Sequence, residues 1–402
     1  MNTKKLSRTC PICGCKKGEI LHTQKFILPE NSPLPNMYDV VSCCKCSFTF
    51  ADTKANQQTY DTFYESQSKY EDKKTSSGGG FNVYDLLRIN ETVEEIIHSC
   101  PDKNARIIDI GCANGGILRL LKEKGYKNLL GYDPSKKCVE SMQNEKITCL
   151  QGSIFNANNV FANQQFDCIL LSHVMEHIYD LQKAFTICFN LLTEGGLLYI
   201  EVPDAARYSD FFVTPYYYFD SEHINHFDEI SLSNLGLTLG FRIKNIGHKE
   251  FNVSDIQQYP ALFIVFSKTL YINHAFEETK CLPAQHTARQ SIMKYVELSA
   301  QNTQNEIISE LLKTQEEILI FGAGNFTIRL LASTDLGKCN IKAFIDNDTN
   351  KQGQTLIDKP VLSSDILKNF NGTILVCAAL FSQEIEKQVK DIRSTGKTII
   401  LQ

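Results

Sequence analysis

The sequence predicts an α/β protein with two Rossmann-like units and a small cysteine-rich amino-terminal domain. Segments 107–110 and 318–321 are apolar runs that each lead into a glycine-containing turn and then an amphipathic stretch. This order indicates a buried parallel strand, a tight loop and a helix. Two C-x-x-C motifs near the amino terminus indicate a separate small domain in front of these units.

Length and composition leave room for several domains and exclude some classes of partner. The chain has 402 residues, 43% of them hydrophobic, and a net charge of -5. We expect two or three domains and no nucleic-acid or membrane partner. The sequence has no apolar stretch long enough to span a bilayer, and its first residues lack a signal peptide's apolar core, so we expect a cytoplasmic protein. In a reducing compartment, the 15 cysteines favour thiols and metal ligands over disulfides.

The two C-x-x-C motifs predict a structural zinc site within residues 1–52. Four thiolates in tetrahedral geometry suit structural zinc, and 29 residues separate the two pairs. Cys15 and Cys44 could each replace a neighbour, but the i, i+3 spacing favours the cysteines that bound each motif. The predicted ligands are Cys10, Cys13, Cys43 and Cys46. Free thiols near a disordered end, and a nucleic-acid-binding zinc ribbon, are the alternatives.

A polar segment, 53–80, is predicted to link this domain to the first α/β unit. It carries several aromatic residues and ends in Ser76-Ser77-Gly78-Gly79-Gly80, which indicates a flexible hinge. The aromatic residues are Tyr60, Phe63, Tyr64 and Tyr70. They either close over a ligand as a lid or pack the linker onto the core, and the sequence leaves both readings open. A helix is expected over 82–98.

The first α/β unit is predicted over 81–270, with five strands that alternate with helices. The expected strands are 107–110, 129–135, 147–153 and 197–203, the last after a Gly195-Gly196 turn, and segment 166–178 is expected to be a strand that runs into a loop and a helix. A helix over 232–239 and two strands, 241–252 and 261–267, are expected to complete the sheet.

The loop after the first strand points to a small cofactor. It reads Asp109-x-Gly111-Cys112-x-x-Gly115, which differs from the G-x-G-x-x-G of dinucleotide-binding folds. Glycines allow the backbone to approach a ligand closely, and the helix amino terminus adds N–H groups. Asp133 ends the second strand, 22 residues beyond Gly111, where a carboxylate can accept both hydroxyls of a ribose.

These elements together resemble the class I S-adenosylmethionine-dependent methyltransferases. The D-x-G-C-x-x-G, G-x-D-P-S, F-D-x-I and L-x-x-G-G-x-L elements occur in the family's order and spacing, from about 81 to 270. The resemblance implies a class I methyltransferase core whose glycine loop lines the methionine side of the cofactor. It implies that Asp133 holds the ribose and that Ser153, where many members have Asp, lies near the adenine. The residues expected at the cofactor are Asp109, Gly111, Cys112, Gly115, Asp133, Ser153 and His173.

Candidate catalytic residues follow the fourth and fifth strands. Glu222, His223 and His226 lie in the aromatic-rich segment 215–228, and His177 follows the fourth strand. The carboxyl ends of parallel strands form the ligand-binding edge of such sheets. Histidine can take up a proton near neutral pH, and a neighbouring carboxylate can orient it. Each histidine could instead be a hydrogen-bonded packing residue.

A narrower resemblance joins these features with the metal motif and the second α/β unit. Together they resemble the zinc-binding nucleotide-sugar C-methyltransferases of deoxysugar biosynthesis. The resemblance implies that His223, beside Glu222, is the base that removes the proton next to a keto group of the sugar. His177 matches a histidine after the family's fourth strand. This family has a tyrosine three residues before the base, whereas the present chain has Asp220 at that position. The substrate contacts therefore differ from the family pattern there.

The remaining chain is predicted as a helical connector, 271–315, and a Rossmann-like domain, 316–402. Asp346 ends its second strand, as Asp133 does in the first unit, but Thr327 replaces the third glycine of the dinucleotide fingerprint. Roughly 85 residues are too few for a full dinucleotide-binding domain. We expect a half-sized unit that helps to hold the nucleotide or sugar of the substrate. A purely structural domain and an NAD site are the alternatives.

The sequence therefore predicts an S-adenosylmethionine-dependent methyltransferase with a structural zinc site and a small-molecule substrate. The expected substrate is a nucleotide-linked keto-deoxysugar that is methylated on carbon. The alternative is O- or N-methylation of another sugar or small metabolite, and a third reading is a non-catalytic zinc-binding regulatory protein. The sequence identifies neither the sugar nor the oligomeric state.

Overall fold

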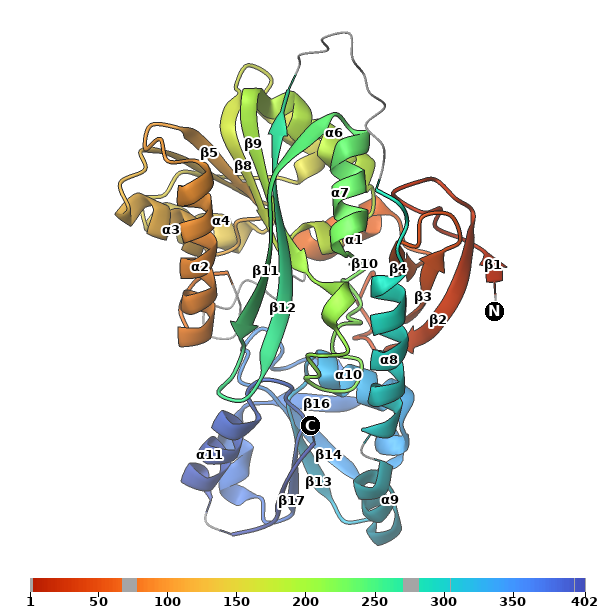
Figure 1. Cartoon of the computed structure of the whole chain (residues 1–402). Helices are drawn as coiled ribbons and strands as arrows, with labels where there is room; N and C mark the ends of the chain where they lie inside the picture. The colour runs from red at the N-terminus through yellow and green to blue at the C-terminus, as the bar shows by residue number, and fades with distance from the viewer. Residues whose placement is uncertain (1–2, 67–77, 270–281, 304, 394, 402) are drawn as a thin grey trace.

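The computed structural model describes residues 3–66, 78–269, 282–303, 305–393 and 395–401. Its strands form three sheets, which belong to an amino-terminal region, a core and a carboxyl-terminal tail domain (Figure 1). Among the described residues, no helix combines the length and the apolar character that a membrane span requires.

The amino-terminal sheet includes a strand from the core. Its own strands are β1 (Thr3–Lys5), β2 (Lys17–Lys25), β3 (Met37–Cys43) and β4 (Thr49–Asp52). The fifth strand, β10 (Asn225–His226), pairs antiparallel with β4. The sequence analysis did not predict this sheet, whose fifth strand lies more than 170 residues along the chain from its partner β4. Backbone hydrogen bonds therefore join the cysteine-rich region to the segment that follows Glu222 and His223.

Helix α1 (Gln57–Ser66) occupies part of the segment that was predicted to be a linker. Its Tyr60 is fully buried, as the packing interpretation requires, whereas Phe63 and Tyr64 line a cleft that is described below. The expectations for Tyr70, Ser76 and Ser77 lie outside the described residues.

The core sheet has seven strands in the order β11-β12-β9-β8-β5-β6-β7. They are β5 (Arg106–Ile110), β6 (Asn128–Asp133), β7 (Cys149–Gln151), β8 (Phe166–Ser172), β9 (Leu192–Pro203), β11 (Phe241–Asn252) and β12 (Gln258–Lys268). The accompanying helices are α2 (Val83–Ser99), α3 (Gly116–Glu123), α4 (Lys136–Asn144), α5 (Ala157–Val160), α6 (Leu181–Leu191) and α7 (Glu229–Thr238), with short 3-10 turns between some elements. These elements confirm the predicted alternation of strands and helices in the unit.

The fifth strand differs from its prediction in where it begins. β9 starts at Leu192, before the two glycines, and its pairing with β8 shifts register between Phe166 and Cys168. Gly195 has a φ of 74°, so the glycine turn is an irregularity within the strand and does not precede it.

The core sheet has a topological switch beside β5. From β5 the chain adds β6 and β7 on one side, and then β8 and β9 on the other, all parallel. Ligands bind in open α/β sheets at the carboxyl ends of the strands, where the strand order reverses. The loop after β5 and the loop after β8 meet at this point.

The tail domain repeats this arrangement on a smaller scale. Its strands are β13 (Ile318–Phe321), β14 (Ile341–Ile345), β15 (Thr355–Leu356), β16 (Lys359–Leu362), β17 (Thr373–Val376) and β18 (Thr398–Ile400), in the order β15-β16-β14-β13-β17-β18. Its helices are α10 (Asn325–Ser333) and α11 (Ser382–Ile392), and the connector forms α8 (Thr287–Gln301) and α9 (Asn305–Thr314). The β15–β16 hairpin was not predicted, because its strands are two and four residues long.

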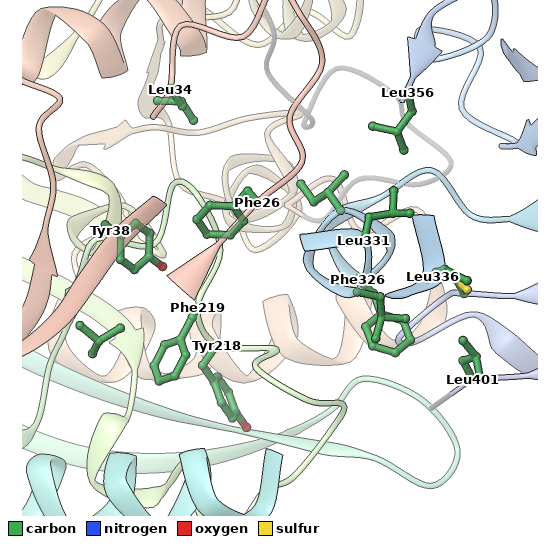
Figure 2. Close-up of a cluster of buried hydrophobic side chains, with 14 of the residues drawn as sticks. Phe26, Leu34, Tyr38, Tyr218, Phe219, Phe326, Leu331, Leu336, Leu356 and Leu401 are labelled. Atoms are coloured by element: carbon green, nitrogen blue, oxygen red, sulfur yellow. The ribbon is translucent and has the colours of Figure 1, made fainter. Parts of the chain in front are cut away.

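One buried apolar cluster contains side chains from all three regions (Figure 2). Phe26 and Tyr38 come from the amino-terminal region, Phe219 from the loop before β10, and Phe326 and Leu331 from α10. Because burial of apolar area is the main stabilising contribution to packing, this shared cluster holds the three regions together around the 216–226 loop.

Candidate functional site

A cleft with a volume of about 1680 Å³ is lined by residues of the core and of the tail domain. The core contributes the loops after β5, β6 and β8, and the tail contributes the loops after β13, β14 and β17. The carboxyl edges of the two sheets therefore border one shared space. Residues of α1, of the 28–32 loop and of the segment that contains Asp220, Glu222 and His223 also line the cleft.

The glycine loop at the core end of the cleft requires its glycines. Gly111 and Gly115 have φ angles of 77° and 73°, which disfavour residues with a Cβ. A Cβ on Gly111 would lie 2.6 Å from Val174 Cγ2, and one on Gly115 would lie 2.7 Å from Met142 Cε. The loop is thus closely packed behind a backbone that lines the cleft at Gly111.

Asp133 lies at the end of β6, where its carboxylate is oriented by two backbone N–H groups. Ala113 N donates to Oδ2 at 2.8 Å, and Ser135 N donates to Oδ1 at 2.8 Å. A carboxylate oxygen accepts more than one hydrogen bond, so this arrangement is compatible with a ribose contact.

Asp109 lines the same end of the cleft and is almost fully buried. Burial and the negative charge of Asp133 raise the pKa of Asp109 to about 7, although Arg88 opposes the shift. A cationic ligand group beside this carboxyl would favour its ionised form.

The other predicted cofactor residues occupy different positions at this end. Cys112 lines the cleft, but its thiol lies 3.4 Å from Met142 Sδ and 3.7 Å from Cys149 Sγ. Its contribution to a ligand would therefore come from the backbone. Ser153 also lines the cleft, and its hydroxyl lies 3.5 Å from Asp61 Oδ1 of α1.

His173 is part of a buried ionic network that the sequence analysis missed. Its Nδ1 lies 3.2 Å from Glu176 Oε1 and its Nε2 lies 3.4 Å from Glu201 Oε1. Burial alone would lower the pKa of His173, but these two carboxylates raise it. Glu201 also accepts a hydrogen bond from Lys249 Nζ at 2.7 Å, and Arg88 Nη1 lies 3.8 Å from it. A glutamate inside the apolar strand 197–203 was the available signal for this network.

The predicted catalytic residues other than His226 converge beside the network. Tyr64 donates a hydrogen bond to Glu222 Oε2 at 3.0 Å, and its hydroxyl lies 2.8 Å from His177 Nδ1. The His177 and His223 rings meet edge to face, with centroids 4.7 Å apart. His177 Nδ1 also lies 3.0 Å from the backbone carbonyl of Glu222, which can only accept, so Nδ1 carries a proton in this contact. The sequence predicted Tyr64 at the site only as one of two alternatives.

His226 does not belong to this cluster, which corrects its prediction as a catalytic residue. It lies in β10, is 1% exposed and is not among the residues that line the cleft. Its Nδ1 lies 3.5 Å from the Tyr208 hydroxyl, while Nε2 is buried with no hydrogen-bond partner among the described residues. Burial, together with the charge of Arg8, lowers the pKa of His226 to about 3, so it remains neutral.

Glu176, His177 and His223 form a group that could approach a metal ion. Their possible ligand atoms lie within 4.8 Å of one another, and Glu176 Oε2 is buried without a hydrogen-bond partner among the described residues. Ligand atoms about 2.1 Å from a tetrahedral ion would lie about 3.4 Å apart. His177 Nε2 and Glu176 Oε1 are 3.9 Å apart, which is wider than this spacing.

The four predicted metal ligands do form a compact group. Cys10 Sγ lies 3.5 Å from Cys46 Sγ, and Cys13 Sγ lies 3.5 Å from Cys43 Sγ. All four sulfur atoms lie within 4.8 Å of one another. Bonds of about 2.3 Å to a tetrahedral zinc ion place sulfur atoms about 3.8 Å apart, so this donor set fits such an ion. Cys15 instead donates to Lys17 O at 3.5 Å, and Cys44 is exposed.

The tail end of the cleft repeats the geometry around Asp133. Ala323 N donates to Asp346 Oδ2 at 2.9 Å, and Asp348 N donates to Oδ1 at 2.9 Å. Lys351 Nζ adds an ion pair with Asp346 at 3.0 Å. A Cβ on Gly322, whose φ is 111°, would lie 2.3 Å from Cys377 O. The tail therefore has its own tightly turned glycine loop, which opens onto the shared cleft.

Thr327, which replaces the third glycine of the dinucleotide fingerprint, is fully buried under this loop. Its hydroxyl donates to Gly322 O at 2.5 Å and lies 3.3 Å from Cys377 O. The side chain thus ties the glycine loop to the end of β17, whereas the fingerprint uses a glycine for close helix–strand packing.

Comparison with known proteins identifies two families along the chain. Residues 84–245 match the methyltransferase domain family, and residues 314–400 match a family described as C2185-like, N-terminal. The chain is 26% identical over 133 residues to a mitochondrial ubiquinone biosynthesis O-methyltransferase of Dictyostelium discoideum, covering 29% of this chain and 41% of that protein. The Sinorhizobium fredii enzyme of the same name is 29% identical over 108 residues, covering 25% and 42%. The chain therefore spans about two fifths of the length of these curated relatives.

Two solved structures are also similar to part of the chain. One is an S-adenosylmethionine-dependent methyltransferase from Archaeoglobus fulgidus, with 17% identity and a TM-score of 0.36, covering 46% of this chain and 100% of that one. Another is magnesium protoporphyrin IX methyltransferase from Synechocystis PCC 6803 with bound SAM, with 12% identity and a TM-score of 0.38, covering 54% and 100%.

The core of this chain is a class I S-adenosylmethionine-dependent methyltransferase domain. The family match covers 84–245, which includes the glycine loop and Asp133, and the seven-stranded sheet supplies the fold. This result confirms the core that the sequence predicted.

Proposed function

We propose that the protein is an S-adenosylmethionine-dependent methyltransferase whose acceptor has two parts, one held by the core and the other by the tail domain. The observation that carries this proposal is the single cleft of about 1680 Å³ that borders the carboxyl edges of both sheets. A small acceptor would need only the core edge, whereas an acceptor with a remote binding group would use both.

The cofactor belongs at the core end of the cleft. Asp133 is oriented there to accept hydroxyl groups, and Asp109 can accept a cationic amino group. When bound, S-adenosylmethionine supplies an electrophilic methyl group. The neighbouring protein groups position the acceptor and handle its proton.

His223 is the proposed base, and Glu222, His177 and Tyr64 position it. His223 lines the cleft and packs edge to face on His177, which the Tyr64 hydroxyl and the Glu222 carbonyl orient through Nδ1. Removal of a proton from the acceptor by His223 would create the nucleophilic atom. A general base of this kind contributes roughly 10²–10⁴-fold to the rate.

The tail end suits a group that bears phosphates, such as a nucleoside diphosphate. Its glycine loop leads directly into the amino terminus of α10, and a helix amino terminus favours anions. A Cβ on Gly324 would meet only Lys351 Nζ, at 3.7 Å, so this part of the loop is open and lies beside a cation. A nucleotide-linked keto-deoxysugar combines such a group with a carbon acid, and we propose its C-methylation as the reaction.

O-methylation is the second candidate. It is favoured by the names of the two relatives, both ubiquinone biosynthesis O-methyltransferases, although the chain spans only about two fifths of each. The same base would then deprotonate a hydroxyl group. The proposed structural zinc ion at Cys10, Cys13, Cys43 and Cys46 has no role in either reaction, because four thiolates close the coordination sphere.

Turnover in deuterium oxide distinguishes the two reactions. The purified protein is incubated with S-adenosylmethionine and a panel of nucleoside-diphosphate-linked 4-keto sugars, and product mass and deuterium at the carbon next to the ketone are measured. C-methylation predicts methyl transfer together with exchange at that carbon. A methylated hydroxyl without exchange would support O-methylation, and neither transfer nor exchange would contradict the nucleotide-sugar acceptor.

Two histidine variants test the base. His223→Asn should lower kcat by roughly 10²–10⁴-fold and abolish the exchange, with little change in cofactor affinity. His226→Asn, a matched change three residues along the chain, should retain turnover. Equal losses of kcat in both variants would show that the substitutions disturb the fold, and would not support proton transfer by His223.

A further inference from the structure

Asp220 is a contact point between the tail domain and the segment that carries Glu222 and His223. Its carboxylate forms an ion pair with Arg329 of α10. Asp220 is 9% exposed and Arg329 is 2% exposed, so the pair is shielded from solvent. Both residues line the shared cleft.

The amino-terminal region holds the backbone of the same segment. The Tyr38 hydroxyl donates to the backbone carbonyl of Asp220 at 2.7 Å, and Arg8 Nη1 donates to the carbonyl of Ile224 at 3.0 Å. Glu222 and His223 lie between these two points. The segment is therefore held by one region through its backbone and by the other through the Asp220 side chain.

The energetics of the Asp220–Arg329 pair favour a positioning role over a stabilising one. Desolvation can cancel the attraction within a buried ion pair, and replacement by apolar residues often leaves stability unchanged or higher. Arg329 Nε is buried with no hydrogen-bond partner among the described residues, so the guanidinium is not fully satisfied. The pair instead defines a direction and a distance between α10 and the 220–224 segment.

The same helix also borders the tail end of the cleft. α10 begins at Asn325, directly after Gly324 of the glycine loop, and Arg329 lies little more than one turn further along. The Asp220–Arg329 ion pair therefore links the segment that carries His223 to the helix that borders the glycine loop, in addition to the apolar cluster that the two share.

We propose that Asp220 and Arg329 are positioning residues, which set the place of His223 relative to the part of the acceptor that the tail domain holds. The inference rests on the proposed function for what the tail holds, but the alignment of His223 by the ion pair can be measured separately.

The kinetic test compares Asp220→Asn, Arg329→Gln and Arg329→Lys with the unmodified chain. A misplacement of about 1 Å can cost roughly 10²-fold in rate, so Asp220→Asn and Arg329→Gln should lower kcat by about that factor. The acceptor KM and the cofactor Kd should change less than about threefold, because neither binding end is altered. Arg329→Lys keeps the charge and should recover part of the rate. Glu317→Gln, which removes an exposed ion pair with Lys342 in the same domain, is the control.

Histidine NMR measures the alignment without any acceptor. In protein labelled with ¹⁵N-histidine, the His223 signals are assigned by their absence in His223→Asn. Asp220→Asn should shift the imidazole signals of His223 and His177, and Glu317→Gln should leave both unchanged. If Asp220→Asn fails to fold, Arg329→Lys supplies the same comparison, because it retains a cation at this site.

The results separate this proposal from the proposed function. Unchanged His223 signals in Asp220→Asn overturn the positioning role, whatever happens to the rate, and so does a kcat within about threefold of the unmodified chain. If no acceptor is methylated by the unmodified chain, a shift of the His223 signals in Asp220→Asn, absent in Glu317→Gln, still supports the positioning role. The proposed substrate alone is then wrong.

Discussion

Burial raises the pKa of Asp109, so the protonation state of this carboxyl group depends on whether a cationic ligand lies beside it. The side chain is 2% exposed, and burial with the nearby charge of Asp133 raises its pKa from 3.8 to about 7. The folded cofactor-free protein therefore retains this proton at a pH where the unfolded chain has lost it. The contribution of Asp109 to stability should fall as the pH rises from about 4 to about 7.

Cofactor affinity should rise with pH, whereas the contribution of Asp109 to stability falls. A cationic ligand favours the carboxylate, so binding below pH 7 must release the proton from Asp109. We expect the Kd to be roughly tenfold lower at pH 8 than at pH 6, because one pKa unit corresponds to a factor of ten. Calorimetry in two buffers of different ionisation enthalpy measures the released proton. Asp109→Asn should remove the pH dependence, and equal affinity of the unmodified chain at both pH values would contradict this role.

At the scale of single elements, the turn between β5 and α3 shows why its glycines are required. Gly111 adopts a left-handed φ of 77°, and a Cβ there would collide with Val174 of the loop after β8. Both the left-handed φ and the contact with Val174 exclude a Cβ at this position. The contact arises because the loops after β5 and β8 meet at the topological switch of the sheet.

Gly111→Ala should therefore weaken cofactor binding as well as stability. A left-handed alanine costs about 1–2 kcal/mol, and the displaced loop should raise the cofactor Kd by at least roughly tenfold. Gly125→Ala is the matched control, because Gly125 has a φ of 92° but a Cβ added there would meet no atom within 4 Å. It should lower the free energy of unfolding, measured with urea, and leave the Kd unchanged. Similar changes of Kd in both variants would show that the effect is not specific to the loop.

At the scale of the whole molecule, the amino-terminal region contacts the 220–226 segment, which carries the proposed base. β4 pairs with β10, and the guanidinium of Arg8 donates to Tyr179 O at 2.7 Å and to Ile224 O at 3.0 Å. These two carbonyls follow His177 and His223 along the chain. The proposed metal site, which includes Cys10, lies two residues from Arg8 in the sequence.

Loss of the metal should accordingly reduce turnover more than cofactor affinity. Cys13→Ser removes a proposed zinc ligand, and small metal-dependent domains lose their fold without the ion. We expect loss of stoichiometric zinc, measured by elemental analysis, and a fall in kcat of at least roughly tenfold, since the segment that carries the proposed base loses its support. Cys15→Ser should keep both the metal and the activity, because its thiol contacts Lys17 O and not the cluster. Equal metal content in the two variants would contradict the proposed ligand set.

The predictions from sequence were most reliable where local pattern determines structure. Short apolar runs followed by glycine turns predicted β5 and β13, and the C-x-x-C spacing predicted a compact group of four thiols. Such signals depend on residues that are close along the chain. The five-stranded amino-terminal sheet was missed, since its strand β10 comes from more than 170 residues away.

His223 and His226 mark the limit of the sequence as a guide to the site. They are three residues apart in one aromatic-rich segment, and the adjacent Glu222 is the local feature that favours His223 as the base. One lines the cleft beside His177, and the other is buried in β10 with its pKa lowered to about 3. Their environments depend on which neighbouring elements pack against each side chain.

The sequence by itself determined the fold of the core, the turns that require glycine and the spacing of the four cysteines, because these follow from backbone geometry and short-range periodicity. Only the tertiary structure decided that the two sheets share one cleft, that Glu201 anchors a buried ionic network, and that Asp220 pairs with Arg329. Each of these features joins residues that are far apart along the chain. Their contacts are set by packing of the whole molecule, which no local pattern records.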